Sequence, residues 1–383
     1  MTKELIAYIR NLYQEPNAFI PLHEPRFLGN EKKYVLDAIE STYVSSVGAY
    51  VDQFEEMMCD LTGAEHAIAI VNGTNALHLA LVLAGVESND EVITQPLTFV
   101  ATANAISYIN AIPHFVDVDM DTMGLSPTIL ESYLEEIAEV KNGVCYNKKT
   151  GRRIKACVPM HTFGLPMRID LLVEVCDKYK IFLVEDAAES IGSYYKEKHI
   201  GRYGKLGVFS FNGNKTITCG GGGAIITDDE NIAKRAKHLS TQAKIPHKWD
   251  FVHDEIGYNY RMPNLNAALA CAQLEKLEGF VKNKRETAEK YMAFLNQYKD
   301  EVSFKKEIDG AKSNYWLCAL EFLEEKQKDE FLELTNQKGI MTRPVWRLMN
   351  HLPQFSSFPK SDLSNSEYLE KRVVNITSSV RVK

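Results

Sequence analysis

The sequence lacks any apolar run long enough to cross a membrane, and it lacks an excess of positive charge. Its 383 residues include 44 Lys and Arg against 51 Asp and Glu, so the net charge is −7. This balance argues against a protein that coats nucleic acid or an anionic membrane surface. The first residues also lack the apolar core of a signal peptide. We therefore expect no nucleic-acid partner, no membrane partner and a cytoplasmic location.

The cysteines lack the pattern of a disulfide framework. There are seven of them, an odd number, and they are widely spaced with no Cys-x-x-Cys pair. Such spacing is typical of buried, reduced thiols in a cytosolic protein. Repeats and low-complexity segments are absent as well, and we expect no metal site.

Two kinds of segment alternate between residues 66 and 230, and this alternation predicts the fold class. Short apolar or β-branched runs predict buried strands: "HAIAIV", "EVIT", "PHFVDVD", "KACVPM", "IFLVED", "GVFSF" and "AIIT". Helical patterns separate several of them: "NALHLALVLAG", "FVATANAISYIN", "SPTILESYLEEIAEV" and "MRIDLLVEVCDKYK". The alternation favours an α/β domain with a mostly parallel sheet. Residues 144–158 predict a small surface hairpin that turns at Thr150–Gly151.

The C-terminal part of the chain predicts a second, smaller domain. Residues 263–296 predict a long helical stretch that links the two domains. A strand at 314–322 and a helix at 325–339 follow, before an irregular tail. We therefore place a large α/β domain with an N-terminal segment at 1–262, and the linking helix with a smaller α+β domain at 263–383.

One lysine stands in an unusual setting, in "FSFNGNKTITCGGGGAIITDD". Lys215 lies between an apolar strand and four consecutive glycines. A nucleotide P-loop is excluded, because Asn214 separates the lysine from Gly213 and no helical pattern follows. A surface lysine is the ordinary alternative, but the flanking residues cannot build a solvated helical face. The setting favours a lysine that forms a Schiff base with pyridoxal phosphate (PLP), with glycines that let other backbone approach closely.

PLP makes three further demands, and the upstream sequence offers a residue for each. Asp186 ends the strand "IFLVED" and could pair with the ring nitrogen, although a helix cap is the commoner role for such an acid. Gly73 and Thr74 lie between a strand and a helix, as a phosphate-binding turn requires. Phe99 begins a helix after a strand and could face the ring, or it could be a core residue. Their order on one α/β domain supports a common site, because ligands gather at the carboxyl ends of such strands.

The chain resembles the PLP-dependent sugar aminotransferases of the DegT/DnrJ/EryC1/StrS group, which have the aspartate aminotransferase-like fold (PLP fold type I). The resemblance runs from about residue 20 to the C-terminus. The matching stretches are "NGTNALHLAL", "PLTFVATANAI", "PHFVDVD", "HTFGLPMRID", "VEDAAESIGS", "FSFNGNKTITCGGGGAI" and "IGYNYRMPNLNAALACAQL". The last three together are highly specific.

This resemblance implies a role for each matched residue. Lys215 would carry PLP as an internal aldimine, and Asp186 would pair with its pyridine nitrogen. Phosphate contacts and ring stacking would come from Gly73, Thr74, Ser210 and Phe99. Asn259 and Arg261 would reach into the neighbouring subunit's site, the asparagine to the phosphate. The resemblance thus implies a homodimer with shared active sites.

A narrower resemblance suggests the substrate. "TITCGGGG", the acid in "DAAES" and "TRPVW" at 342–346 resemble the branch that aminates C4 of UDP-linked 4-keto-6-deoxy-N-acetylhexosamines. Those reactions feed bacterial surface sugars, with glutamate as the expected amino donor. The partners implied are therefore a nucleotide-linked keto sugar and glutamate.

Glu189 departs from the family pattern. Three residues past the aspartate the wider family usually carries Gln or His, near the cofactor's ring hydroxyl. A carboxylate there would repel the phenolate oxygen unless it were protonated. We therefore predict a raised pKa for Glu189, or a side chain that turns away. The tail "NITSSVRVK" departs as well, from a Pro-containing end.

Several other side chains are candidates for binding the sugar nucleotide. His161 could lie near the cofactor or the sugar, or it could be a packed residue at a strand end. Arg343, Trp346 and Arg347 could offer a stacking face and phosphate donors, or they could belong to a loop that packs the domains together.

Three rival functions remain open from sequence. Amination at C3 of the sugar uses the same residues. An amino-acid transaminase or lyase is possible with Arg343 as the carboxylate-binding residue. A non-catalytic regulator on the same fold is the third, although the retention of Lys215 with Asp186 argues against a decayed site. Dehydratases of this family carry histidine in place of the lysine, so Lys215 argues against that activity.

Overall fold

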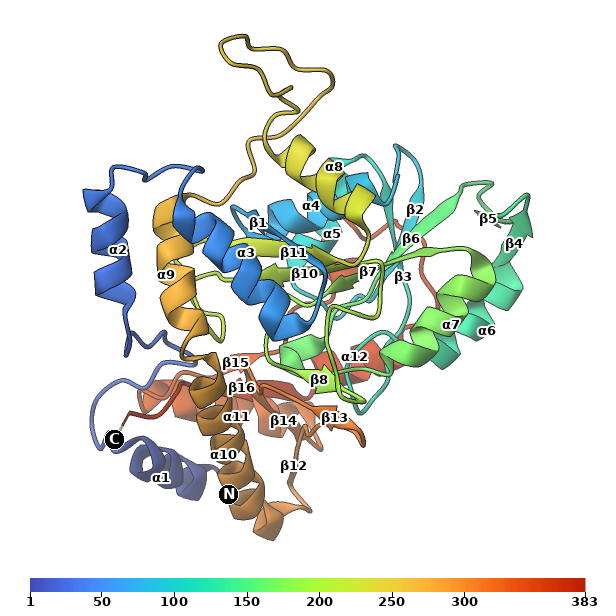
Figure 1. Ribbon diagram of the computed structural model, residues 1–383. Helices are drawn as coiled ribbons and strands as arrows, with labels where there is room; N and C mark the ends of the chain where they lie inside the picture. The colour runs from blue at the N-terminus through green and yellow to red at the C-terminus, as the bar shows by residue number, and fades with distance from the viewer. Residues whose placement is uncertain (383) are drawn as a thin grey trace.

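The central element of the computed structural model, which describes residues 1–382, is a seven-stranded sheet (Figure 1). Its order is β1 (His66–Ile70), β11 (Gly223–Thr227), β10 (Leu206–Ser210), β7 (Phe182–Asp186), β6 (Ile154–Val158), β2 (Glu91–Thr94) and β3 (Ile112–Phe115). Strand β11 runs opposite to the other six: it pairs antiparallel with β1 and β10, and the remaining pairs are parallel. The predicted α/β class with a mostly parallel sheet is confirmed.

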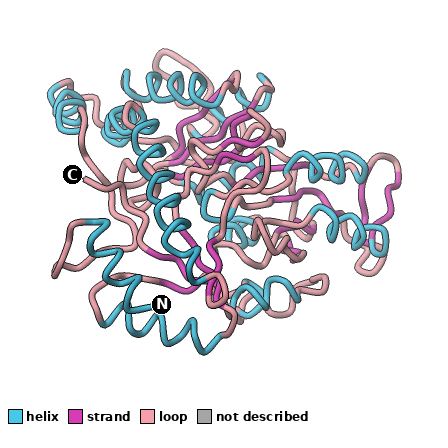
Figure 2. Tube along the Cα trace, turned by 90° about the horizontal axis from the view of Figure 1, so that it is seen from below, coloured by secondary structure: helices cyan, strands magenta, loops and turns pink. Residues whose placement is uncertain are grey.

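Helices cover both faces of this sheet, which is why its strands are apolar almost throughout (Figure 2). One face packs against α3 (Ala49–Thr62), α6 (Pro127–Ile137), α7 (Ile169–Tyr179) and α9 (Asn264–Leu274). The other face packs against α4 (Gly73–Leu83), α5 (Val100–Tyr108) and α8 (Glu230–Ser240). In β11 the alternation is direct, since Ala224 and Ile226 belong to the first core and Ile225 to the second.

A second, smaller unit is built on a four-stranded antiparallel sheet. Its order is β12 (Val302–Phe304), β14 (Cys318–Phe322), β16 (Val373–Ile376) and β15 (Arg343–Pro344). Its core includes residues of α10 (Leu277–Leu295), α11 (Glu325–Gln337), α12 (Ser364–Glu370) and also α1 (Thr2–Tyr13). Figure 1 shows both chain ends on the side of this unit. The smaller α+β unit is confirmed, whereas the boundary at 262/263 stays a prediction.

The predicted long helix at 263–296 is two helices. Helix α9 ends at Leu274 and α10 begins at Leu277, so Glu275 and Lys276 separate the two helices. The apolar pattern continues across the break, because α9 and the start of α10 contribute to the same core. The tail that we expected to be irregular contains α12 and β16.

The predicted helix at 126–140 ends at Ile137, and a hairpin follows. Strands β4 (Ala138–Lys141) and β5 (Val144–Asn147) pair across Asn142–Gly143, whose φ angles are 52° and 76°. Asn-Gly is the preferred sequence for such a left-handed two-residue turn, and it overrides the helical pattern. The hairpin expected at Thr150–Gly151 is reduced to a tight turn, closed by the single bridge from Tyr146 to Arg153.

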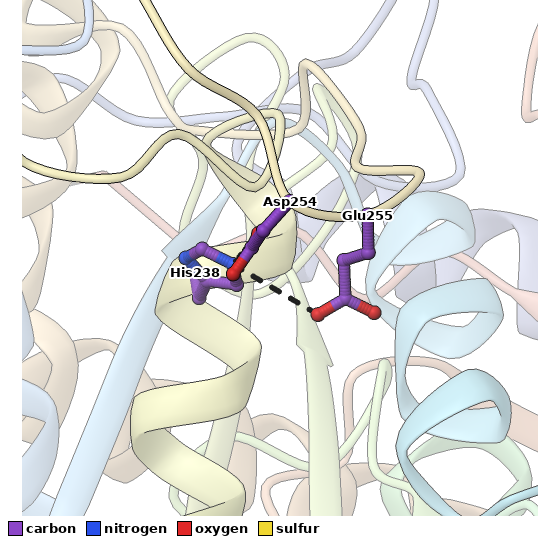
Figure 3. A group of neighbouring side chains, drawn as sticks. All are labelled: His238, Asp254 and Glu255. Atoms are coloured by element: carbon purple, nitrogen blue, oxygen red, sulfur yellow. Dashed lines mark hydrogen bonds and ion pairs between the residues drawn. The ribbon is translucent and has the colours of Figure 1, made fainter.

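An extended arm of residues 241–258 leaves the body above α8 (Figure 1). The segment that returns from its tip is fixed to α8 by polar contacts, and Figure 3 shows His238 on α8 beside Asp254 and Glu255 of this segment. His238 lies 2.7 Å from a carboxylate oxygen of Asp254, and Arg235 donates two hydrogen bonds of 2.9 Å to Glu255. These contacts hold the base of the arm while its tip projects from the molecule.

The structure also bears on the cysteines and on membrane-spanning segments. All seven cysteines are unpaired, and six of them are buried. Among residues 1–382, no helix is both long enough and apolar enough to cross a membrane.

Candidate active site

A pocket of about 570 Å³ opens at the carboxyl ends of the sheet strands, beside the smaller unit. Most of the residues singled out from sequence lie around it, although they come from distant segments. They are Gly73, Thr74, Phe99, Asp186, Glu189, Ser210, Lys215 and Trp346. The parallel strands explain this gathering, since their carboxyl ends share one edge of the sheet.

Lys215 points into this pocket from a tight turn after β10. Its backbone N–H donates to the carbonyl of Asn212, which closes the turn. Its amine nitrogen Nζ lies 3.1 Å from Oε1 of Glu189 and 3.9 Å from the ring centre of Trp316. The amine is therefore held between a carboxylate and an aromatic face.

Glu189 is buried, and its two oxygens have different partners. Oε1 faces the amine of Lys215, while Oε2 accepts a 2.8 Å hydrogen bond from the backbone N–H of Phe163. Burial raises the pKa of the Glu189 carboxyl above its ordinary value, and the charge of Lys215 opposes that rise. The side chain does not turn away from the lysine, so the raised pKa is the alternative that its surroundings support.

Asp186 ends β7 and lies at the bottom of the pocket. It accepts hydrogen bonds from the hydroxyl of Thr102 at 2.8 Å and from the backbone N–H of Ala188 at 3.2 Å. Burial nevertheless raises the pKa of this carboxyl. A cationic group bound in front of Asp186 would favour its ionised form.

The N-terminus of α4 forms an anion cradle on the side of the pocket near β1. Asn72 caps this helix by accepting from the N–H of Asn75 at 2.8 Å. The first N–H groups of the helix, at Gly73 and Thr74, have no acceptor within the helix and favour an anion. A Cβ at Gly73 would lie 2.7 Å from the side chain of Ser210, so only glycine lets the two come this close.

The glycine run explains how this cradle is packed. A Cβ on Gly223 would lie 2.6 Å from the carbonyl carbon of Asn72 and 2.9 Å from the nitrogen of Gly73. The start of β11 therefore lies directly against the backbone of the cradle. This is the close backbone approach that the sequence predicted, located at the last glycine of the four.

These residues fit PLP. The lysine amine can bond the aldehyde, the buried carboxylate can pair with a protonated ring nitrogen, and the helix N-terminus with Ser210 can take the phosphate. The surroundings of Asp186 point the same way, because its carboxylate is buried and, among the described residues, hydrogen-bonded only to the neutral donors Thr102 and Ala188, so a cationic ring nitrogen in front of it would be favourable. Phe99 is half-exposed at the rim, at the start of α5.

His161 does not line the pocket. It is fully buried, and its Nε2 lies 3.3 Å from the buried carboxylate of Glu185. Its Nδ1 accepts from the backbone N–H of Met167 at 3.3 Å. With both ring nitrogens engaged, His161 holds the segment after β6 in place, which matches the packed role that the sequence left open.

The two arginines near Trp346 also point away from the pocket. Arg343 donates to the side chain of Asn336 on α11 at 3.1 Å. Arg347 is exposed, with its Nε 3.7 Å from Glu370. Of the three candidates in this segment, only Trp346 lines the pocket of its own chain.

Asn259 and Arg261 lie outside the pocket as well, at the base of the arm. Their neighbours Tyr258 and Tyr260 stack on each other, with ring centres 4.9 Å apart, and pack against His78 on α4. Because side chains alternate along an extended segment, Asn259 is turned outward and is exposed. Its role in a neighbouring subunit stays a prediction.

Two residues of the smaller unit were missed by sequence reasoning. Trp316 lines the pocket beneath Lys215. Asn314 is buried and donates to the carbonyl of Glu189 at 2.9 Å. Both lie in "SNYWLC", most of which we predicted to be a strand. The one sequence signal for another role is the polar side chain of Asn314 at a position expected to face the core.

Comparisons with known proteins agree with this geometry. Residues 27–383 match the DegT/DnrJ/EryC1/StrS aminotransferase family. GDP-perosamine synthase of Escherichia coli O157:H7 is 36% identical over 338 residues, which are 88% of this chain and 87% of that protein. GDP-perosamine synthase of Vibrio cholerae is 36% identical over 369 residues, 94% of each chain. A Streptococcus pneumoniae protein solved in its PLP form has the same fold, with a TM-score of 0.84, 19% identity and 95% of each chain covered.

The chain belongs to the DegT/DnrJ/EryC1/StrS aminotransferase family, in PLP fold type I. It is a PLP-dependent sugar aminotransferase that acts on nucleotide sugars. The family resemblance and the cofactor predicted from sequence are both confirmed.

The packing of Gly223 predicts a position-specific effect within the glycine run. Gly223→Ala should lower the free energy of unfolding by about 1–3 kcal/mol, because its Cβ would overlap the backbone of the cradle. PLP affinity should fall with it. Gly221→Ala is the matched control, since the nearest atom to its Cβ would be 3.8 Å away. Thermal unfolding and PLP titration compare the two, and equal effects would contradict this account.

The buried carboxylate of Glu189 predicts a pH dependence in the apo-protein. Because burial raises its pKa, the folded state keeps a proton that the unfolded chain releases above about pH 4.3. Stability should therefore decrease as pH rises from there through the raised pKa. Glu189→Gln should make that decrease smaller, as measured by urea unfolding from pH 4.5 to 8. Exposed Glu301→Gln is the control, and an unchanged slope for Glu189→Gln would refute the assignment.

Proposed function

We propose that the protein transfers an amino group from glutamate to the C4 keto group of a nucleotide-linked 4-keto-6-deoxy sugar, and that this sugar is UDP-2-acetamido-2,6-dideoxy-4-keto-hexose. The observation that carries the aminotransferase chemistry is the amine of Lys215 held in one pocket with the buried acids Asp186 and Glu189. The C4 position and the UDP sugar rest on the sequence resemblance alone. The relatives named for a GDP sugar make GDP the second candidate nucleotide.

Each side of the pocket has its own task in this reaction. PLP, when bound, supplies an electron-withdrawing ring that stabilises negative charge on the carbon next to the amino group. Asp186 would keep the ring nitrogen protonated, and the cradle at Gly73, Thr74 and Ser210 would hold the phosphate. The amine of Lys215 is then the group that we propose moves the proton.

Lys215 would carry a proton between two substrates in turn. It takes the proton from the α-carbon of glutamate and becomes an ammonium, which Glu189 stabilises at 3.1 Å. The ammonium would give this proton to the cofactor before 2-oxoglutarate is released by water. In the second half-reaction the amine would take a proton back from the cofactor and give it to the former keto carbon of the sugar. The two substrates thus use one site in sequence.

The outer part of the pocket would receive the sugar. Trp346 lies there beside Phe99, which the resemblance places against the PLP ring; the two ring centres are 6.3 Å apart and the planes are tilted by 59°. Phe163 packs behind Trp346 at 4.9 Å and supports it. Such aromatic faces suit the apolar C–H surface of a deoxy sugar. Arg343 is engaged with Asn336, which speaks against the rival role of an amino-acid carboxylate clamp.

We further propose a homodimer in which each subunit completes the other's site. The arm of residues 241–258 exposes large apolar side chains: Trp249, Phe251 and Ile256 are 77%, 74% and 85% exposed. Helix α2 (Glu31–Glu40) adds exposed Leu36 and Ile39. Apolar surface of this kind favours burial against another subunit. The unpaired cysteines agree with the cytoplasmic location that we propose for this dimer.

The two-stage scheme predicts ping-pong kinetics. Initial rates measured against both substrates should give parallel double-reciprocal lines. With glutamate as donor and a panel of UDP-, GDP- and dTDP-linked 4-keto-6-deoxy sugars, mass spectrometry should find amination of the UDP-N-acetyl sugar. Intersecting lines would exclude the scheme. A preference for a GDP sugar would change the nucleotide that we propose for the substrate, but not the proposed two-stage chemistry.

The shared site predicts complementation between two inactive variants. Lys215→Ala and Asn259→Ala remove residues of different subunits from one site, so a mixed dimer keeps one intact site. Random mixing in equal amounts should restore about a quarter of wild-type activity. A mixture of Lys215→Ala with Asp186→Asn is the control, because both residues serve the same site and no intact site forms. No recovery in the first mixture would exclude the shared arrangement.

A further inference from the structure

Trp316 of the smaller unit contacts the turn that carries the reactive lysine in two ways. Its indole Nε1 donates a 2.7 Å hydrogen bond to the carbonyl oxygen of Asn214. Its ring lies beneath the amine of the next residue, with the centre 3.9 Å from Nζ of Lys215. One side chain therefore holds both the backbone and the reactive group of this turn.

The orientation of Trp316 is itself fixed by buried partners. Its backbone N–H donates to the side-chain oxygen of Asn314 at 2.8 Å. Its carbonyl accepts from the hydroxyl of Ser378 at 2.8 Å. Trp316 is almost fully buried, so its ring has little freedom to swing away from the lysine.

The face of an indole ring attracts a cation, and the attraction increases when water is excluded. The ring of Trp316 and the carboxylate of Glu189 contact the same nitrogen. Both contacts restrict where this nitrogen lies, and both attract it when it carries a proton. These contacts therefore keep the amine in position while it carries a proton.

We propose that Trp316 is a positioning residue for Lys215, which it holds through the carbonyl of Asn214 and, when the amine carries a proton, through its ring face. The inference rests on the proposed function in requiring that Lys215 moves a proton during amino transfer. In each half-reaction the amine gains one proton and gives one up, and the water that releases the keto acid in the first is regenerated in the second, so protons and water balance.

Two variants separate the contacts of Trp316. Trp316→Phe keeps a ring face and loses the indole N–H, whereas Trp316→Leu loses both. Phe322→Leu is the matched control, because Phe322 lies on β14 of the same unit and packs against Phe331. Circular dichroism and thermal unfolding establish that each variant is folded.

The first measurement uses the apo-protein and no substrate. Acetic anhydride is added at pH 8, and peptide mapping by mass spectrometry compares acetylation of Lys215 with that of surface lysines. Loss of the ring face should make Lys215 react about 3- to 10-fold faster in Trp316→Leu. Trp316→Phe should show a smaller increase, and Phe322→Leu should match the wild type.

The second measurement follows the half-reaction with glutamate by its visible absorbance change. Trp316→Leu should slow this step about 10-fold, from the loss of one cation–ring contact and one hydrogen bond. In a Lys215→Ala background, added methylamine can serve as the proton acceptor. Trp316→Leu should then change the rate by less than about 2-fold, since there is no lysine left to position.

The outcomes distinguish a positioning role from mere support of the pocket wall. Unchanged labelling of Lys215 in both folded Trp316 variants would overturn the inference, and so would a 10-fold loss that persists with methylamine. Neither measurement contains a sugar. If both give the expected results and no nucleotide sugar is aminated, the proposed substrate is wrong and the inference about Trp316 stands.

Discussion

The rest of this structure depends on keeping one lysine amine inside a largely buried pocket. A buried ammonium is unfavourable unless it has close partners, because it has lost most of its hydration. Here the partners are the carboxylate of Glu189 and the ring of Trp316. Glu189 also holds the backbone N–H of Phe163, whose φ of 59° is unusual for a bulky residue. Glu189 thus links two parts of the pocket. One of its oxygens contacts the amine of Lys215, and the other holds Phe163, which packs against Trp346.

The parallel sheet makes this arrangement possible by bringing distant segments to one edge. The acid ends β7, the lysine follows β10, and the anion cradle follows β1. Close packing then sets the distances, most clearly where Gly223 lies against the backbone of Asn72. The smaller unit contributes what the sheet cannot, since Trp316 and Asn314 reach the pocket from the segment before β14. The site is therefore a joint product of the two units.

The arm of residues 241–258 differs between its tip and its base. The arm exposes aromatic side chains at its tip, yet its base is fixed to α8 by the polar contacts of His238, which Figure 3 shows, and by those of Arg235. In the homodimer that we propose, this apolar tip would be buried against the second subunit.

The sequence by itself determined the fold class, the family and the cofactor, and it located several of the residues that line the pocket. Lys215 before the glycines, Asp186 at a strand end and Gly73 before a helix are examples, because strand and helix periodicity locate them. The tertiary structure decided which other side chains meet them. It turned His161 toward Glu185 and Arg343 toward Asn336, and it brought Trp316 under a lysine about a hundred residues away. Contacts of that kind depend on how helices and sheets pack in space, and neither periodicity nor spacing along the chain records them.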